Sequence, residues 1–585
     1  MHYRLNTKDT NQSKEPLRVG LTRLLPVMAG EGRNVALAFF AIIVSSSTTL
    51  TAPLIIAHIV DRFIATGDYQ GVFVWSGILL GIYLIGLVSS YVQSRTMGRV
   101  GRRILFNLRN AIFTKLQELP VAFFNQNKSG DLISRINNDT DKINQFFAQA
   151  LMQFLSNAAL IVGAGILLVS LNPRLGLAAL VPAIVVLGAT RLLSGWVKRT
   201  SFASLQTLGG LSGEIQESLA NFKVIVAFNR LDYFRDKFAG ANQANYAASV
   251  KAGVASNIFL PLYGLAANLG TLIVLAYGIV LISNGELTTG LLIGYILYVT
   301  NFYMPLRQLA TIWASLQLAL AGLDRISEVL ALKSDMAVVP SDNTKGDAVM
   351  GFESVSFHYP GGQDVLTDIN FSLERGKTYA LIGPTGGGKT TTASLMARLY
   401  DPSAGTVRLN GRDIRAFTAQ ERADAIGFIL QEPFLFTGTV GDNISYGNAA
   451  FADLADGKLS QKLDEAGLSR LLSRFDQGLD TPVSASGDAM SLGQKQLIAF
   501  MRAALRNPQL LILDEATANI DTVTEKLLED ILDALPAQTT TVIIAHRLNT
   551  INNADEIFFV NGGTVTPAGS MESAVDMLLN GQMRS

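Results

Sequence analysis

The chain contains 585 residues with a formal net charge of zero, and only 16% of them are charged, against about 25% in typical soluble domains. Its mean hydropathy of +0.30 is unusual for a soluble protein. The zero net charge argues against nucleic acid as a bulk electrostatic partner, and the absence of cysteine excludes disulfides, Cys-ligated zinc and thiol catalysis.

Residues 1–33 form the first predicted segment. They are polar and mixed in charge, with a short amphipathic stretch from Leu17 to Met28 and no visible signal peptide. We predict a cytoplasmic N-terminal segment with an amphipathic elbow helix.

Residues 34–325 contain six apolar runs free of Asp, Glu, Lys and Arg. A helix needs about 20 apolar residues to cross ~30 Å of hydrocarbon, and a charge at its centre costs roughly 2.5–3.5 kcal/mol on insertion scales. Buried core helices are the alternative, but six such runs favour a six-helix, all-α transmembrane domain. The runs are Asn34–Ala57, Gly71–Ser94, Ile143–Pro173, Leu175–Thr190, Ala252–Gly285 and Leu287–Leu306.

The distribution of Lys and Arg predicts the orientation in the membrane. The two long connections, 95–142 and 191–251, hold nine and eight of these residues, whereas the three short connections together hold two. Because positive charge favours the cytoplasmic side, we expect a multi-pass protein of the inner or plasma membrane with cytoplasmic N- and C-termini. The long connections are expected to be helical extensions of the spans, for example Val100–Leu119 and Leu211–Phe238.

The composition changes after the sixth run. Residues 326–348 are predicted to be a linker, and residues 349–585 alternate short β-rich runs with helices. Leu510–Leu513 and Thr541–Ile544 are continuously apolar, as strands of a sheet covered on both faces require. The predicted fold is therefore multidomain, with an α/β domain after the transmembrane domain.

A glycine-rich segment, Gly383–Thr390, lies between an apolar run and a helix-like run. It has the form of a P-loop, whose backbone N–H groups and following helix N-terminus hold phosphates. Lys389 can reach the β- and γ-phosphates, and the Thr390 hydroxyl can hold Mg²⁺. An incidental glycine-rich turn is the alternative, and the match at all eight positions argues against it. The predicted ATP-binding residues here are Gly383, Pro384, Thr385, Gly386, Gly387, Gly388, Lys389, Thr390 and Thr391.

Two carboxylates end an apolar strand at Asp514 and Glu515. Asp514 is suited to Mg²⁺, and Glu515 could orient or deprotonate the attacking water. The alternative interpretation is two exposed acidic residues in a turn. A P-loop about 120 residues upstream favours a catalytic role for these carboxylates.

Other strand-end residues could complete the site. His546 follows Thr541–Ala545 and could donate to the γ-phosphate, although a lone His is more often structural. Gln431 follows Gly427–Leu430 and could sense Mg²⁺ and water. Tyr359 could stack on a nucleobase, and Tyr400 or Phe357 would be equally acceptable on this argument alone.

Met490–Gln496 precedes a helix-like run. Ser491 at a helix start can bind an anion through its hydroxyl and the backbone N–H groups, but an ordinary N-cap explains it equally well in isolation.

Together these motifs make the chain similar to an ABC transporter half-subunit of the exporter type. The resemblance covers residues 17–575, and two short segments, Pro120–Asp139 and Phe222–Asn229, resemble the coupling regions of the family. It implies Lys389, Glu515 and His546 as catalytic residues, and a Mg²⁺ site made by Thr390, Gln431 and Asp514. The motifs in the family's order are the P-loop, Gln431, Met490–Gln494, Asp514–Glu515, Ala518–Asp521 and His546.

The signature segment departs from the family pattern LSGGQ. The resemblance implies that Ser491, Gly493 and Gln494 bind the ATP held by a partner's P-loop, but Leu492 stands where the first glycine belongs and Met490 where the leucine belongs. A bulky side chain obstructs close backbone approach to a phosphate. The segment Pro482–Asp488 departs as well. We therefore favour a heterodimer over a homodimer. In the heterodimer, the signature segment of a second half-transporter, with the family's usual sequence, would face this P-loop.

The resemblance implies ATP-driven export of hydrophobic or amphipathic compounds, such as drugs or lipids, by alternating access. The expected cofactors are ATP and Mg²⁺, and the expected partners are a second subunit, the lipid membrane and a small apolar cargo, with no nucleic acid. A peptide exporter, an importer of a small chelate and an ATP-gated channel or regulator remain alternatives. A soluble ABC ATPase acting on DNA or ribosomes is rejected by the six apolar runs.

Overall fold

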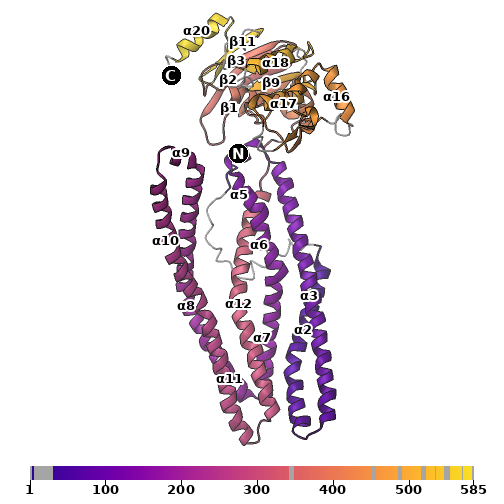
Figure 1. Cartoon of the computed structure of the whole chain (residues 1–585), viewed down its shortest axis with the longest axis vertical. Coiled ribbons are helices and arrows are strands. Elements are labelled where there is room, and N and C mark those ends of the chain that lie inside the picture. Colours follow the sequence, from indigo (N-terminus) through magenta and orange to yellow (C-terminus); the bar gives the residue numbers. More distant parts are fainter. Residues whose placement is uncertain are drawn as a thin grey trace. The chain divides into compact units, whose positions relative to one another are not determined.

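The chain is divided by its internal contacts into two units, shown together in Figure 1. Met1–Leu5, Glu118–Ser129 and Leu332–Ser585 form the sheet unit, and Asn6–Gln117 and Gly130–Ala331 form the helical unit. The computed structural model describes residues 3–5, 30–336, 338–340, 348–448, 456–484, 490–514, 522–533, 535–545, 554–569 and 571–582.

The helical unit contains six helical stretches that are long and apolar enough to cross a membrane. Each contains all or most of one of the six apolar runs, which confirms the predicted six-helix transmembrane architecture. The stretches are Gly32–Ile64, Tyr69–Gln117, Ser129–Leu171, Pro173–Ala220, Leu231–Ser283 and Thr289–Leu309. The amphipathic segment predicted at 17–28 lies outside the described residues.

Several of these stretches are built from consecutive helical segments. Their bounds are α2 (Gly32–His58), η2 (Ile59–Ile64), α3 (Tyr69–Gln117), α4 (Val121–Gln126), α5 (Ser129–Ser134), η3 (Arg135–Asp139), α6 (Thr140–Gln145), η4 (Phe146–Ala150), α7 (Leu151–Leu171), α8 (Pro173–Ala220), α9 (Phe222–Ala227), α10 (Leu231–Asn257), α11 (Phe259–Ser283) and α12 (Thr289–Leu330). The segments η2, η3 and η4 are π-helical.

The two long connections differ from each other in structure. Val100–Leu119 is helical as expected, because α3 continues to Gln117. Leu211–Phe238 is not one helix: α8 ends at Ala220, the short α9 follows, and α10 begins at Leu231. Asn229, between α9 and α10, has a left-handed φ of 50°, which breaks the helical path. The turn lets α8 and α10 run side by side (Figure 1).

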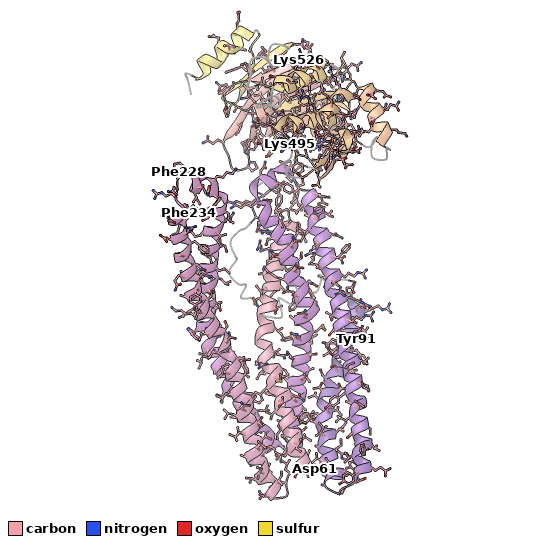
Figure 2. All side chains as sticks on the ribbon, in the orientation of Figure 1. Asp61, Tyr91, Phe228, Phe234, Lys495 and Lys526 are labelled. Atoms are coloured by element: carbon pink, nitrogen blue, oxygen red, sulfur yellow. The ribbon has the colours of Figure 1, made fainter. Side chains whose placement is uncertain are left out.

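A carboxylate, Asp61, lies at one end of the helical bundle (Figure 2). Figure 2 places Asp61, in η2, at one end and Phe228, just after α9, at the other. Asp61 accepts hydrogen bonds from the Thr288 hydroxyl (2.5 Å) and the Gly290 N–H (2.7 Å). This carboxylate therefore caps the N-terminus of α12, where negative charge is favourable.

Helix α12 is tied to three neighbouring helices by tyrosine hydroxyls. Tyr295 donates to a carbonyl of α7 (2.9 Å), Tyr298 to a carbonyl of α2 (2.5 Å) and Tyr303 to a carbonyl of α8 (2.9 Å). All three side chains are buried. Because hydrocarbon offers no water to hydrogen bond, these bonds allow polar groups to sit inside an apolar bundle.

The sheet unit is an α/β fold with a six-stranded sheet of order β12-β11-β3-β10-β9-β6 and a four-stranded sheet of order β2-β1-β4-β5. Its strands are β1 (Met350–His358), β2 (Asp364–Leu373), β3 (Thr378–Ile382), β4 (Ala404–Leu409), β5 (Arg412–Asp413), β6 (Ile426–Ile429), β7 (Gly438–Thr439), β8 (Pro482–Val483), β9 (Leu510–Asp514), β10 (Thr540–Ile544), β11 (Glu556–Asn561) and β12 (Thr564–Pro567). Its principal helices are α13 (Lys389–Met396), α14 (Ala419–Ala425), α15 (Val440–Ser445), α16 (Asp456–Glu465), α17 (Leu492–Ala504), α18 (Thr522–Asp533) and α20 (Met571–Gln582).

Alternate residues of the central strands enter two separate cores. In β3, Tyr379 and Leu381 pack with residues of the four-stranded sheet, whereas Ala380 and Ile382 pack with α15 and α17. Because side chains alternate between the faces of a strand, a strand buried on both faces must be apolar throughout. This explains the continuous apolar runs in the sequence.

Residues 3–5 and the segment Glu118–Ser129, which contains α4, belong to the sheet unit and contact each other. Tyr3 is buried, lies edge-on to Phe123 and donates to Asp335 (2.5 Å). Asn127 donates to the Tyr3 carbonyl (2.9 Å). Burial, with the Asp335 carboxylate nearby, raises the pKa of Tyr3 to about 12, so its hydroxyl remains a donor at neutral pH. The N-terminus, α4 and the residues just after α12 thus form one cluster.

Candidate ATP-binding site

The predicted site residues follow strands that run parallel within the six-stranded sheet. Strand β10 pairs in parallel with β3 and β9, and β9 pairs in parallel with β6. Ile544 lies opposite both Leu381 and Asp514. The carboxyl ends of all four strands therefore meet at one edge, which is where ligands bind in open α/β sheets.

The loop after β3 is shaped by close contact with β11. A Cβ at Gly383 would lie 2.0 Å from the Val560 carbonyl oxygen, and one at Gly387 would lie 2.6 Å from the same atom. Gly386 has a φ of +82° with nothing near its Cβ position. The loop thus packs against β11 through two glycines and leaves a third facing open space, as a phosphate-binding loop requires.

We expect Gly383→Ala to weaken ATP binding at least tenfold and to destabilise the sheet unit by about 1–3 kcal/mol, because the loop must shift away from Val560 and the residue keeps a strained φ. Nucleotide-analogue titration and thermal unfolding of the full chain measure the two effects. Gly351→Ala is the matched control, since its Cβ position has no atom within 4 Å. Equal behaviour of the two variants would contradict this role of Gly383.

Lys389 is the first residue of α13 and is buried, with 5% of its surface exposed. Its Nζ donates to the carbonyls of Gly383 (2.8 Å) and Pro384 (3.0 Å). An ammonium group has three donors, and these two bonds hold the lysine side chain inside the P-loop.

The predicted Mg²⁺ ligands fit that ion chemically. The Thr390 hydroxyl donates to Asp514 Oδ1 over 3.3 Å, so a hydroxyl and a carboxylate already lie together. Gln431 is exposed just after β6, next to β9 in the sheet. All three side chains offer hard oxygen atoms, which Mg²⁺ prefers.

The three aromatic candidates for base stacking form one cluster, with ring centroids 5.0–5.5 Å apart. Phe357 is buried, so it has no free face. The Tyr400 hydroxyl accepts a hydrogen bond from Asn125 of α4 (2.7 Å). Tyr359 is half-buried, and its hydroxyl lies 3.0 Å from Thr391 Oγ1 in α13. The cluster favours Tyr359 as the stacking residue, and the sequence contained no signal for the contact with Asn125.

The signature segment forms the start of α17. Ser491 is the N-cap, and its hydroxyl accepts from the Gln494 N–H (3.2 Å) while Gln494 Oε1 accepts from the Ser491 N–H (3.0 Å). Gln494 also donates to the Arg474 carbonyl (2.8 Å). Gly493 is buried, and the half-buried Leu492 is the first residue of the helix. Ser491 therefore acts as an ordinary N-cap, and the segment also presents the N-terminus of a helix.

Two predicted catalytic residues, Glu515 and His546, and the predicted loop Ala518–Asp521 lie outside the described residues. The strands before them are described: β9 ends at Asp514 and β10 at Ile544.

A six-span helical unit and a mostly parallel sheet with a P-loop at its carboxyl edge define a multi-pass membrane protein with a P-loop ATPase. Two family profiles match the chain: the ABC transporter transmembrane region at residues 35–306 and the ABC transporter profile at residues 366–518. The chain belongs to the ABC transporter family, as an exporter-type half-transporter that couples ATP hydrolysis to transport.

Similar proteins cover nearly the whole chain. The uncharacterized ABC transporter ATP-binding protein YfiC of Bacillus subtilis is 32% identical over 559 residues, covering 95% of this chain and 92% of that protein. The fatty acid ABC transporter ATP-binding/permease protein of Mycobacterium tuberculosis is 31% identical, over 86% and 79%. The multidrug resistance ABC transporter ATP-binding and permease protein of Lactococcus lactis is 31% identical, over 85% and 84%.

Proposed function

We propose that this chain exports a hydrophobic or amphipathic compound, such as a drug or a lipid, with both termini on the cytoplasmic side of the inner or plasma membrane. Its charge-free spans support an apolar cargo. Two similar proteins are named for fatty acids and for multidrug resistance. The proposed parts are an N-terminal segment (1–33), a transmembrane domain (34–325), a linker (326–348) and an ATPase domain (349–585).

The proposed chemistry uses the P-loop and residues that follow β6, β9 and β10 in the sequence. Glu515 would hold and deprotonate the attacking water, His546 would donate to the γ-phosphate, and Lys389 would neutralise developing negative charge. Thr390, Asp514 and Gln431 would hold Mg²⁺, which supplies charge neutralisation when bound. The adjacent oxygens of Thr390 and Asp514 support this assignment.

We further propose that the chain works as one half of a heterodimer. The observation that carries this proposal is Leu492 at the first position of α17, in a chain whose P-loop has every residue of the motif. In the family's head-to-tail dimer, this helix N-terminus faces the ATP held by the partner's P-loop. A leucine side chain there shields N–H groups that should point at phosphate. This signature segment therefore binds the partner's ATP poorly.

Leu492→Gly tests the heterodimer proposal. In the chain purified alone, we expect the substitution to raise ATP hydrolysis at least tenfold, because it restores the clamp in both sites of a self-assembled dimer. In the complex isolated with its native partner subunit, we expect less than a twofold change, since the hydrolysing site already uses the partner's signature. Full hydrolysis by the unaltered chain alone, with a stable two-fold dimer, would contradict the proposal.

A second prediction concerns the connection between α4 and the nucleotide site. Asn125 donates to Tyr400, Tyr400 lies edge-on to Tyr359, and Tyr359 contacts Thr391 next to the P-loop. We expect Asn125→Ala to lower transport per ATP hydrolysed by two- to tenfold, the effect of about 0.5–1.5 kcal/mol from one hydrogen bond.

The measurement compares ATP-driven dye uptake into inverted membrane vesicles, which corresponds to export, with ATP hydrolysis by the same vesicles. Tyr400→Phe keeps the ring contact with Tyr359 but removes the hydroxyl, so it should have the same effect, and the double variant should be no worse than either single one. Additive losses would show that the two side chains act independently.

A further inference from the structure

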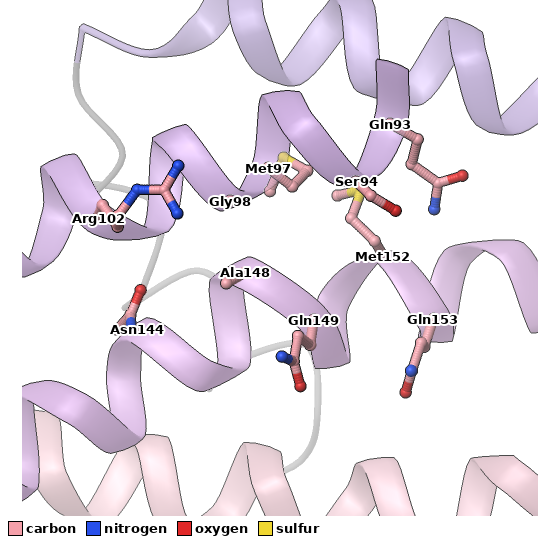
Figure 3. A pocket seen from close by; sticks show the side chains of 10 residues that line it. All are labelled: Gln93, Ser94, Met97, Gly98, Arg102, Asn144, Ala148, Gln149, Met152 and Gln153. Atoms are coloured by element: carbon pink, nitrogen blue, oxygen red, sulfur yellow. The ribbon is translucent and has the colours of Figure 1, made fainter. Parts of the chain in front are cut away.

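A cavity of about 440 Å³ lies within the helical unit, between α3 on one side and α6, η4 and α7 on the other (Figure 3). Its volume falls within the range of about 300–1,000 Å³ usual for small-molecule sites. On α3 it begins at Gln93, near the end of the charge-free run Gly71–Ser94, and extends to Arg102 in the arginine-rich stretch. At about 1.5 Å per residue that run can cross the hydrocarbon, so we expect the cavity to lie at headgroup depth.

The space exists because the two sides approach closely at one level and separate at the next. A Cβ at Gly101 would lie 2.7 Å from Asn144 Oδ1 and 2.9 Å from the Ala148 Cβ, so the helices touch there. One turn away, a Cβ at Gly98 would have no atom nearer than 3.8 Å, an arginine nitrogen. The π-helical segment η4 lies opposite, and such segments interrupt regular helix packing.

The lining combines an apolar floor with positive charge. Met97 and Met152 are buried, with 0% and 3% of their surface exposed, and Figure 3 shows the Met152 side chain reaching toward α3. Arg102 is the single cation among the lining residues, none of which is a carboxylate. It is exposed, and within the described part of the chain it makes no ion pair. Side-chain amides supply most of the remaining polar atoms.

One buried polar atom at the cavity has no hydrogen-bond partner. Asn144 Oδ1 is buried and unpartnered among the described residues. Leaving a buried acceptor unsatisfied is unfavourable, so a donor from water or from a headgroup hydroxyl is expected to reach it. This atom belongs to α6 and faces Gly101 of α3.

From these observations we infer that the cavity binds an amphiphilic anion, with its headgroup oxygens on Arg102 and the start of its tail against Met97 and Met152. Arginine binds carboxylate and phosphate oxygens through charge-assisted hydrogen bonds, and methionine adapts to chains of varied shape. The occupant could be a free fatty acid or an anionic phospholipid of the surrounding leaflet. This inference goes beyond the proposed export function, because binding requires neither ATP nor a partner subunit.

The test uses the full chain in detergent and two fluorescent probes, cis-parinaric acid and its methyl ester, at a pH well above the carboxyl pKa. We expect Arg102→Gln to weaken binding of the acid about 10- to 100-fold, as the loss of one charge-assisted hydrogen bond does, and to leave the ester unaffected. Gly98→Leu fills the cavity and should weaken both probes at least tenfold.

Two matched controls separate the cavity from general effects. Arg99→Gln removes a neighbouring arginine that does not line the cavity, and Gly81→Leu adds the same bulk to α3 at a position with no atom within 4 Å of the Cβ. Both should bind the acid normally. The inference is overturned if Arg102→Gln and Arg99→Gln behave alike, or if Gly98→Leu leaves binding unchanged. Displacement of the acid by anionic phospholipid would identify the bilayer as the source, and resistance would identify the free acid; either supports the site.

Discussion

Replacing Glu515 with glutamine is expected to slow ATP hydrolysis by the assembled transporter about 100- to 10,000-fold, the usual contribution of a general base. Glutamine keeps the size of the side chain and its ability to touch water, but it cannot accept a proton. ATP binding should survive, because the proposed phosphate contacts are those of the P-loop and Lys389. Hydrolysis and equilibrium binding of radiolabelled ATP measure the two effects separately.

The control for this prediction is Glu529→Gln, which changes an exposed carboxylate on α18. It should hydrolyse ATP at the unaltered rate. If Glu515→Gln also retained that rate, Glu515 would not be the base, and the assignment of this P-loop as the hydrolysing site would lose its support.

The second large effect is expected at Arg135, the largest fully buried side chain in the described part of the protein, with 1% of its surface exposed. It donates to Asp131 in α5 (2.9 Å), to Glu328 in α12 (2.9 Å) and to the Arg325 carbonyl (2.5 Å). Arg325 in turn pairs with Asp131 and with the buried Asp139. This network holds the first long connection to the end of α12.

We expect Arg135→Ala to destabilise the helical unit by about 3 kcal/mol. Removing one partner of a buried ion pair costs about 3–5 kcal/mol, and the lower end applies since Asp131 keeps its pair with Arg325 and Glu328 is partly exposed. Thermal unfolding of the purified chain in detergent should show a lower melting temperature.

Arg235→Ala is the comparison for Arg135→Ala. Arg235 pairs with Asp232, and both side chains are exposed, so its loss should change stability by less than about 1 kcal/mol. If the two variants melted together, the network around Arg135 would contribute no more than a surface pair.

Sequence patterns were sufficient wherever the signal is local. A span must be free of charge over the thickness of the hydrocarbon, and a strand buried on both faces must be apolar throughout. Both patterns are visible in the sequence, so the six spans and the α/β fold could be predicted. Leu211–Phe238 extends the spans as helix, but the sequence did not show the turn within it, because residue type alone does not show that Asn229 adopts a left-handed conformation there. The choice among Tyr359, Tyr400 and Phe357 also stayed open, since burial and the Asn125 contact join residues far apart in the chain.

The amino-acid sequence by itself determined that this protein is a membrane ABC transporter with its own P-loop, because each motif is a short contiguous segment whose residue types are required by its chemistry. The tertiary structure decided which residues surround those segments. It places the Val560 carbonyl against Gly383 and Asn125 against Tyr400, and it opens a cavity beside Arg102. Such contacts depend on how distant segments pack, which no local pattern encodes.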